Sequence, residues 1–138
     1  MTQRIAGTRN YAFGDELPPV IKVLNQDKIN RYAEASGDHN PLHTDPAFAA
    51  TTQFGGTIAH GMLVLAYMSE MMTKAFSDAW LMGGRLKVRF RGVARPGDTV
   101  TAHGRIVRAE GGRAVCEVEC RNQLGDVLVS GSAEVAIR

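Results

Sequence analysis

Two side chains capable of proton transfer flank a short, stiff turn in the first third of the chain. Asp38 and His43 stand on either side of Asn40 and Pro41, in a stretch rich in turn-forming residues. Aspartate and histidine are common general acids and bases, because both can exchange protons when their surroundings tune them suitably. Held on one rigid turn, they could share a single water molecule, which predicts a site for acid–base chemistry.

The same residues also have structural explanations. Asp38 could cap a turn, and His43 taken alone would more often be a structural or surface histidine. His39 and His43 suggest a metal site, but Pro41 lies between them and keeps them off a common helix face. With no cysteine or third histidine suitably placed, the sequence predicts no metal. His60 is expected to be structural, supporting the helix start or the neighbouring loop.

The segments around this turn have the patterns of one strand and several helices. Asp27 can cap a helix that Gly37 then ends, and Pro46 can occupy the first turn of another. An apolar run after two prolines indicates the strand. The predicted elements are a strand at residues 21–24 and helices at residues 28–36, 46–51 and 57–76.

The longest predicted helix, residues 57–76, is apolar on almost every side in its first half. Such a helix is normally buried on all sides, whereas its more polar far end is expected to reach solvent. The methionines in and after this helix are expected to pack in the core, with some lining an adaptable pocket. They are Met62, Met68, Met71, Met72 and Met82.

The C-terminal half alternates apolar and polar residues, which is typical of strands. Turn-forming residues divide it into predicted strands at residues 85–91, 99–108, 113–121 and 127–137. Consecutive hairpins would form a meander, and its apolar face would pack on the long helix. The pattern therefore predicts an α+β fold and a single domain over residues 1–138.

Composition excludes several classes of protein. The net charge of +2 is too small to indicate nucleic-acid binding. The first ten residues lack the apolar run of a secretion signal, and residues 62–68 are far fewer than the roughly 20 that span a bilayer. Cys116 and Cys120 would lie about 13 Å apart on one strand face, too far apart for a disulfide. A cytoplasmic protein with free thiols and no membrane contact is expected.

Residues 36–62 resemble the motif of the MaoC-like dehydratases, which include the (R)-specific, type 2 enoyl-CoA hydratases. That motif is a Ser-Gly-Asp-x-Asn-Pro-x-His turn, here at residues 36–43, then Asp-Pro at 45–46 and His-Gly-Met at 60–62. The resemblance implies a hot-dog fold, in which an antiparallel sheet wraps around one long central helix.

The resemblance also implies roles for single residues. Asp38 and His43 match the family's catalytic acid–base pair, and Asn40 matches the asparagine beside that pair. Gly61 matches the glycine whose backbone N–H holds the thioester oxygen. A helix N-terminus suits this role, because its unpaired N–H groups and its dipole favour negative charge.

Three further residues are expected to contact the substrate. Ser69 falls where some family members place a supporting serine, and Arg85 and Lys87 could meet the phosphates of coenzyme A. Coenzyme A would be part of the substrate, and no separate cofactor is implied. The family also implies a homodimer, because a single unit leaves an open sheet edge and a half-built acyl tunnel.

The implied reaction is (R)-specific hydration of a trans-2-enoyl-CoA to a (R)-3-hydroxyacyl-CoA, or the reverse dehydration. The carrier could equally be acyl carrier protein. One alternative is a hot-dog acyl-CoA thioesterase, which would use a carboxylate on the central helix, where Glu70 is the only candidate. Another is a non-catalytic subunit that binds acyl thioesters, which would not need Asp38 and His43.

Overall fold

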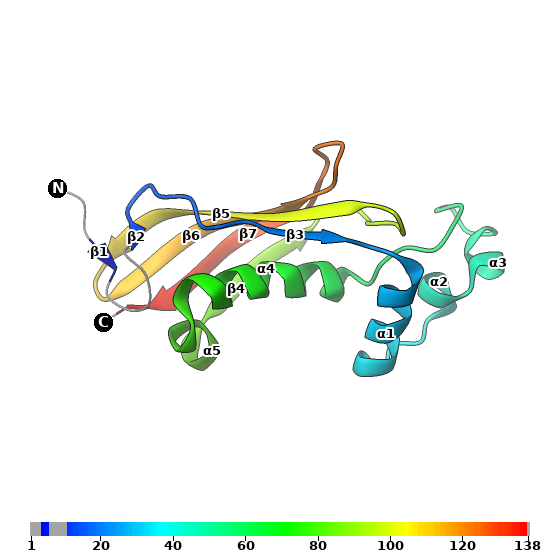
Figure 1. Ribbon diagram of the computed structural model, residues 1–138, viewed down its shortest axis with the longest axis horizontal. Coiled ribbons are helices and arrows are strands. Elements are labelled where there is room, and N and C mark those ends of the chain that lie inside the picture. The colour runs from blue at the N-terminus through cyan, green and yellow to red at the C-terminus, as the bar shows by residue number, and fades with distance from the viewer. Residues whose placement is uncertain (1–3, 6–10, 138) are drawn as a thin grey trace.

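The computed structural model describes residues 4–5 and 11–137. Its main feature is a five-stranded antiparallel sheet with a long helix along one face, and two short strands near the N-terminus form a separate pair (Figure 1). Residues 1–10 were predicted to lack a secretion signal. Most of this segment lies outside the described residues. The elements are β1 (Arg4–Ile5), β2 (Tyr11–Ala12), β3 (Val20–Val23), α1 (Gln26–Ser36), α2 (Pro41–Thr44), α3 (Pro46–Ala49), α4 (Gly61–Phe76), α5 (Asp78–Gly83), β4 (Arg85–Phe90), β5 (Thr99–Glu110), β6 (Arg113–Arg121) and β7 (Val127–Ala136).

The main sheet has five antiparallel strands in the order β3-β5-β6-β7-β4. The predicted meander is correct for β5, β6 and β7, whose connecting turns are short. It is wrong for β4, which pairs with β7 at the far edge of the sheet. The longer connection over residues 91–98 lets the chain cross from that edge to β5. Gly131 permits the β4–β7 pairing, because a Cβ there would collide with the Lys87 carbonyl oxygen.

The core lies between the inner face of the sheet and one side of α4. The alternating positions of β6, from Ala114 to Cys120, all face this core. The helix contributes residues at spacings of three and four, as expected for one buried face. They are Leu63, Val64, Met68, Met71, Met72, Ala75 and Phe76.

The prediction that the first half of the long helix is buried on all sides is wrong. The helix begins at Gly61 rather than Thr57, and Met62 in its first turn is 55% exposed. The far half is well buried, through Met71 and Phe76 among others. The sheet forms a single layer along α4, so it covers only one side of the helix. Met82, also predicted for the core, is exposed as well.

The two thiols match the prediction made from the strand pattern. Cys116 and Cys120 are free and buried on β6. Burial raises the pKa of each thiol to about 12. Neither sulfur therefore ionises near neutral pH, and both serve as small apolar residues of the core.

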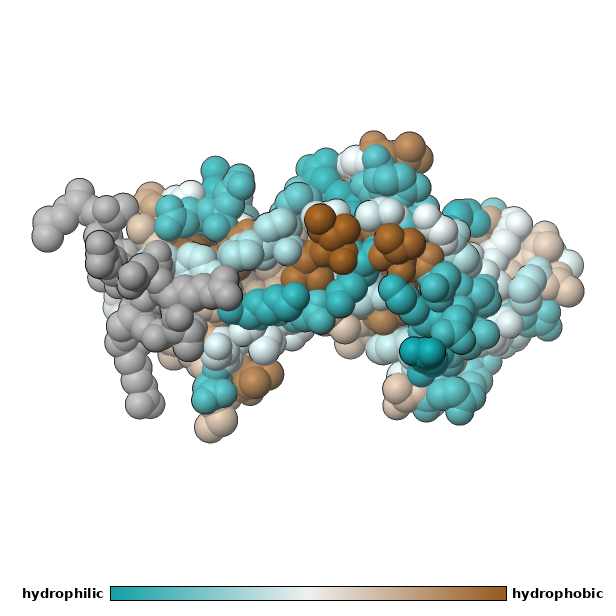
Figure 2. All heavy atoms as spheres, viewed as in Figure 1, coloured by the Kyte–Doolittle hydropathy of each residue, from teal (hydrophilic) through white to brown (hydrophobic). Residues whose placement is uncertain are grey.

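The edge strand β3 has an apolar outer face. Val20 and Lys22 point toward α4, where Lys22 forms an ion pair with Glu70 at 3.1 Å. Ile21 and Val23 point the other way and are 62% and 56% exposed. Figure 2 shows brown, hydrophobic side chains over this part of the sheet. Among the described residues, the helices are all too short or too polar to cross a membrane.

Helices α1, α2 and α3 extend beyond the end of the sheet, next to the first turn of α4 (Figure 1). Asn25, rather than Asp27, caps α1, because its side chain accepts a hydrogen bond from the Lys28 N–H at 2.8 Å. Gly37 ends the helix in the left-handed conformation, as predicted. The expected turn after it contains a helical turn, α2, with Pro41 at its first position. Helix α5 and the small β1–β2 pair were not predicted.

Candidate active site

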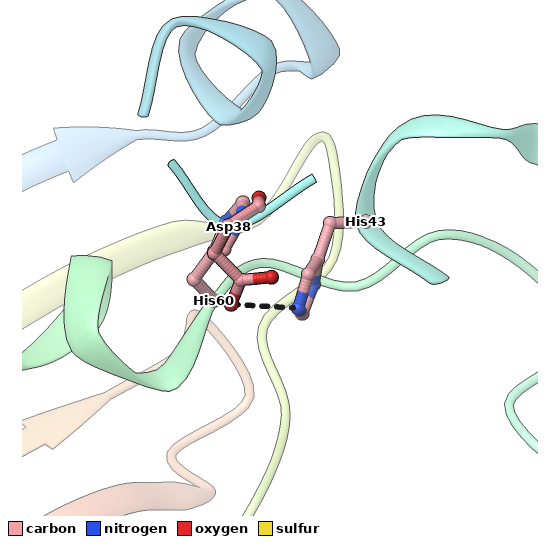
Figure 3. A group of neighbouring side chains, drawn as sticks. All are labelled: Asp38, His43 and His60. Atoms are coloured by element: carbon pink, nitrogen blue, oxygen red, sulfur yellow. Dashed lines mark hydrogen bonds and ion pairs between the residues drawn. The ribbon is translucent and has the colours of Figure 1, made fainter. Parts of the chain in front are cut away.

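Asp38 and His43 meet at the exposed end of the molecule, beside the start of α4 (Figure 3). The His43 Nε2 atom lies 4.0 Å from Oδ2 of Asp38. The aspartate side chain is 55% exposed, whereas that of His43 is only 12% exposed. A separation of 4.0 Å is too long for a direct hydrogen bond, but it lets both atoms contact one water molecule.

The other ring nitrogen of His43 determines its tautomer. Nδ1 lies 2.8 Å from the backbone carbonyl oxygen of Ile58. A carbonyl oxygen only accepts hydrogen bonds, so Nδ1 must carry the proton and donate it. In the neutral ring the lone pair is therefore on Nε2, which faces Asp38. Nε2 can accept a proton from a bound water and return it later.

His60 supports both members of this pair. Its Nε2–H donates to the backbone carbonyl oxygen of Asp38 at 3.0 Å, and its ring stacks on that of His43 at a centroid distance of 3.8 Å. The Tyr32 ring contacts it edge-on. Burial is the largest cause that lowers the pKa of His60, with a smaller contribution from nearby His43. A neutral His60 thus braces the Asp38 loop, as expected, and also contacts His43, which was not expected.

The argument against a metal from sequence was partly wrong. His60 is a third histidine, and one donor atom each from Asp38, His43 and His60 lies within 4.8 Å of the others. However, the two imidazole planes are stacked and only 23° from parallel. Their in-plane lone pairs run side by side and do not converge on one point, whereas zinc needs nitrogen atoms about 2.0–2.1 Å away in a tetrahedral arrangement. The geometry suits proton transfer better than metal binding.

Gly61 is the first residue of α4 and lies next to His43. His60 precedes the helix without a side-chain cap, and the N–H groups of Gly61 and Met62 find no acceptor within the part of the chain that the structure describes. These free donors and the helix dipole create a position that favours negative charge. A Cβ on Gly61 would come within 3.0 Å of the Phe90 ring, so a larger residue would crowd this position.

A pocket of about 160 Å³ opens beside Gly61 and His43. Apart from these two residues, its wall is formed by apolar side chains and backbone. Its side chains come from α4, the end of β4, β7 and the segments before and after them. The apolar contributors include Ile58, Val64, Phe90, Val93 and Val129.

Of the other predicted site residues, Asn40 lies between Asp38 and His43, whereas Ser69, Arg85 and Lys87 lie elsewhere. Asn40 is exposed and caps α2, where its Oδ1 accepts from the Leu42 N–H at 3.0 Å. Ser69 lies roughly 12 Å along α4 from Gly61, given the helical rise, and accepts a hydrogen bond from Trp80. Arg85 and Lys87 are exposed on β4, and Arg85 begins that strand at the end away from the pocket. Asn40 nevertheless lies beside the Asp38–His43 pair, as expected, because its backbone N–H donates to Oδ1 of Asp38 at 3.2 Å and its carbonyl oxygen accepts from the His43 N–H at 2.9 Å. The structure does not bring Ser69, Arg85 or Lys87 to the pair.

Gln26 is a positioning residue that the sequence did not reveal. Its Nε2 donates to the backbone carbonyl oxygen of His43 at 2.7 Å and to the Asn30 side chain at 3.0 Å. Its Oε1 accepts from the Thr57 hydroxyl at 2.7 Å. One amide group therefore links α1, α2 and the segment that supplies the Ile58 carbonyl. A glutamine at the start of a helix is common, so no sequence pattern marks this role.

This fold and this pair place the chain in a known class. A model of the MaoC-like domain family matches residues 12–127, and the chain belongs to that family. It is 31% identical over 118 residues to the (R)-specific enoyl-CoA hydratase of Aeromonas caviae, an alignment that covers 84% of this chain and 88% of that protein. It is also 34% identical to the 3-hydroxyacyl-thioester dehydratase Z of Mycobacterium tuberculosis, over 64% of this chain and 61% of the relative.

Solved structures agree with this assignment. The unliganded R-hydratase PhaJ1 of Pseudomonas aeruginosa superposes with a TM-score of 0.84 and 26% identity, over 99% of this chain and 88% of that one. The (R)-hydratase of A. caviae superposes with a TM-score of 0.81 and 28% identity, over 95% of this chain and 100% of that one. These similarities confirm the predicted hot-dog fold.

The lowered pKa of His60 predicts that the protein loses stability in mild acid. In the unfolded chain this imidazole binds a proton near pH 6.5, whereas in the folded protein it does so only at lower pH. Between these values the unfolded state holds more protons, so the free energy of unfolding falls as the pH drops below about 7. Urea unfolding at several pH values measures this loss. The loss of stability in acid should be smaller in His60→Gln. It should persist in His103→Gln, because His103 is exposed on β5. Equal pH dependence in wild type and His60→Gln would contradict the assignment.

Proposed function

We propose that this protein hydrates trans-2-enoyl thioesters to (R)-3-hydroxyacyl thioesters, or catalyses the reverse dehydration. The observation that carries the proposal is the pairing of Asp38 with the Nε2 lone pair of His43, next to the free N–H of Gly61. The chain is similar to a hydratase named for enoyl-CoA and to a dehydratase named for 3-hydroxyacyl thioesters. The expected cytoplasmic location stays a prediction.

The proposed mechanism needs only residues of this chain. A water held between Asp38 and His43 adds its oxygen to C3, and the pair takes one of its protons. The electrons of the double bond move onto the thioester carbonyl, which becomes an enolate oxygen near the Gly61 N–H. The pair then delivers a proton to C2 on the same face. Acid–base groups of this kind typically contribute about 10²- to 10⁴-fold to the rate.

Gly61 would stabilise the enolate oxygen through its position at the start of α4. Its N–H has no competing acceptor among the described residues, and the helix dipole acts in the same direction. A single donor of this kind is commonly worth about 10²- to 10³-fold in kcat. Ground-state carbonyl oxygens carry less charge, so the interaction strengthens as the reaction proceeds.

The carrier of the acyl group is proposed to be coenzyme A, as in the name of the A. caviae relative, with acyl carrier protein as the alternative. Coenzyme A would enter as part of the substrate, without a separate cofactor. Arg85 and Lys87 are proposed to meet its phosphates, since both are exposed on the strand that ends at the pocket. Asn40 is proposed to support the site by holding the α2 turn. Ser69 is proposed to support it through its hydrogen bond with Trp80.

The rival functions have less support. Glu70, the carboxylate that a thioesterase would need on the helix, forms an ion pair with Lys22 on the β3 side of α4. It is therefore engaged and turned away from His43. A non-catalytic binding subunit would have no need for the tautomer of His43 that the Ile58 carbonyl selects.

Substitution of the pair tests the proposal directly. Asp38→Asn and His43→Gln should each lower kcat for crotonyl-coenzyme A by about 10²-fold or more, because each removes proton transfer. Loss of the enoyl thioester absorbance measures the rate, and chiral analysis should find the (R)-product. The matched control His103→Gln should keep wild-type activity. Release of free thiol by the wild type, without hydration, would instead assign a thioesterase.

Gln26 offers a test of positioning. Gln26→Ala and Thr57→Val should lower kcat about tenfold with a smaller change in KM, because small displacements of a catalytic group are costly. Asn30→Ala removes the other acceptor of the Gln26 amide and should leave kcat unchanged. The apparent pKa in the pH–rate profile should shift in Gln26→Ala, which a purely structural role would not cause. An unaltered kcat and an unaltered pH–rate profile in Gln26→Ala would rule out a positioning role for Gln26.

We also propose a homodimer built along β4. This strand leaves one edge of the sheet unpaired within the described residues. Phe90 and Val93, at and after its end, and Met62, which follows Gly61, expose apolar surface. Light scattering after gel filtration should give about twice the 14.9 kDa chain mass. Met62→Glu should weaken the dimer, whereas Leu124→Glu, at the exposed β6–β7 turn, should not. A wild-type monomer at micromolar concentration would contradict the proposal.

A further inference from the structure

The pocket beside Gly61 limits what can react at the Asp38–His43 pair. Its volume is about 160 Å³, and the side chains that line it beyond His43 are apolar. A protein cavity of about 150 Å³ with apolar walls holds one benzene molecule. The pocket next to the pair therefore has room for about six carbon atoms.

The reacting atoms take part of that space. If the thioester oxygen lies at the Gly61 N–H and C3 lies near His43, the first three acyl carbons occupy the mouth of the pocket. Only about three further carbons then fit in the remaining volume. A longer chain would have to open the pocket or pass along the surface.

The inner wall of the pocket is firmly packed. Val64 and Val129 are 3% and 1% exposed, and Met68, one turn further along α4 than Val64, is fully buried, at 0%. The Cys120 thiol lies 3.6 Å from the Val64 carbonyl oxygen, which closes the space between α4 and β6. Enlarging the pocket in this direction would require moving core side chains, at a cost in stability.

The outer wall is different, because it depends on one side chain. Phe90 ends β4, is 53% exposed, and has its ring against Gly61. The ring atoms Cδ1 and Cε1 lie 3.0 Å from the position of a Cβ on Gly61. Removal of this ring would open the pocket on its outer side without disturbing the buried core.

We propose that Phe90 is the residue that determines acyl-chain length, and that it restricts the enzyme to short enoyl thioesters of about four to six carbons. This inference rests on the proposed hydration reaction and specifies its substrate class. The bulk of the phenyl ring excludes longer chains, while its apolar face contacts the short ones. Because the ring is neither charged nor able to form strong hydrogen bonds, it discriminates between acyl chains by their size.

The test compares enoyl-coenzyme A esters of four, six, eight and ten carbons. Wild-type kcat/KM should fall at least tenfold between the six- and ten-carbon esters, since one misfitting methylene in a pocket costs about 10- to 200-fold. Phe90→Ala should raise the ten-carbon to four-carbon ratio of kcat/KM about tenfold or more. Phe90→Leu, which keeps much of the volume, should stay close to wild type. Phe48→Ala removes an exposed phenylalanine of α3 that does not line the pocket and should leave the ratio unchanged.

Binding of saturated butyryl- and decanoyl-coenzyme A, measured by calorimetry, provides a readout independent of turnover. The wild type should bind the short ester more tightly than the long one, and Phe90→Ala should reverse or remove that preference. Equal use or binding of short and long esters by the wild type would overturn the inference, as would an unchanged profile in Phe90→Ala. Absence of turnover with every ester, together with size-selective binding, would overturn the proposed reaction but leave the role of Phe90 supported.

Discussion

Burial of one face of α4 against the sheet is the constraint on which the rest of the structure depends. Met68, Met71 and Met72 are fully buried there, and burying each such side chain contributes about 1.5–3 kcal/mol. Gly104 on β5 lets the helix approach closely, since a Cβ at that position would lie 2.9 Å from the Met71 methyl group. Because the helix is held along its length, its first turn has a fixed place at the end of the sheet.

That fixed first turn organises the site. His60 immediately precedes α4, donates to the Asp38 carbonyl and stacks on His43. Ile58, two residues earlier, accepts the Nδ1–H of His43, and Ala59 is tied by its N–H to Ala94 after β4. The proposed catalytic pair thus sits on a separate loop and a short helix, but its geometry is set by the segment leading into α4. Gln26 completes the support from α1.

Several surfaces along β4 lack a partner within the described residues of a single chain. The strand has a free edge within the described part of the chain, Phe90 covers Gly61 from that side, and Met62 exposes apolar surface beside it. An edge strand of this kind favours pairing with another strand. The same surface therefore connects the proposed dimer with the access of an acyl chain to the pocket, since both depend on the position of Phe90.

The sequence by itself determined the strands of the main sheet, the principal helices and the identity of the candidate pair, because these depend on local patterns. Alternation along β6, the glycine that ends α1 and the turn around Pro41 act over a few residues. Tertiary structure alone decided that β4 pairs with β7, that Met62 is exposed, that His60 and Gln26 support His43, and how large the pocket is. Periodicity indicates which face of an element is apolar, but the partner of that face is set by pairing and packing between residues far apart in the chain.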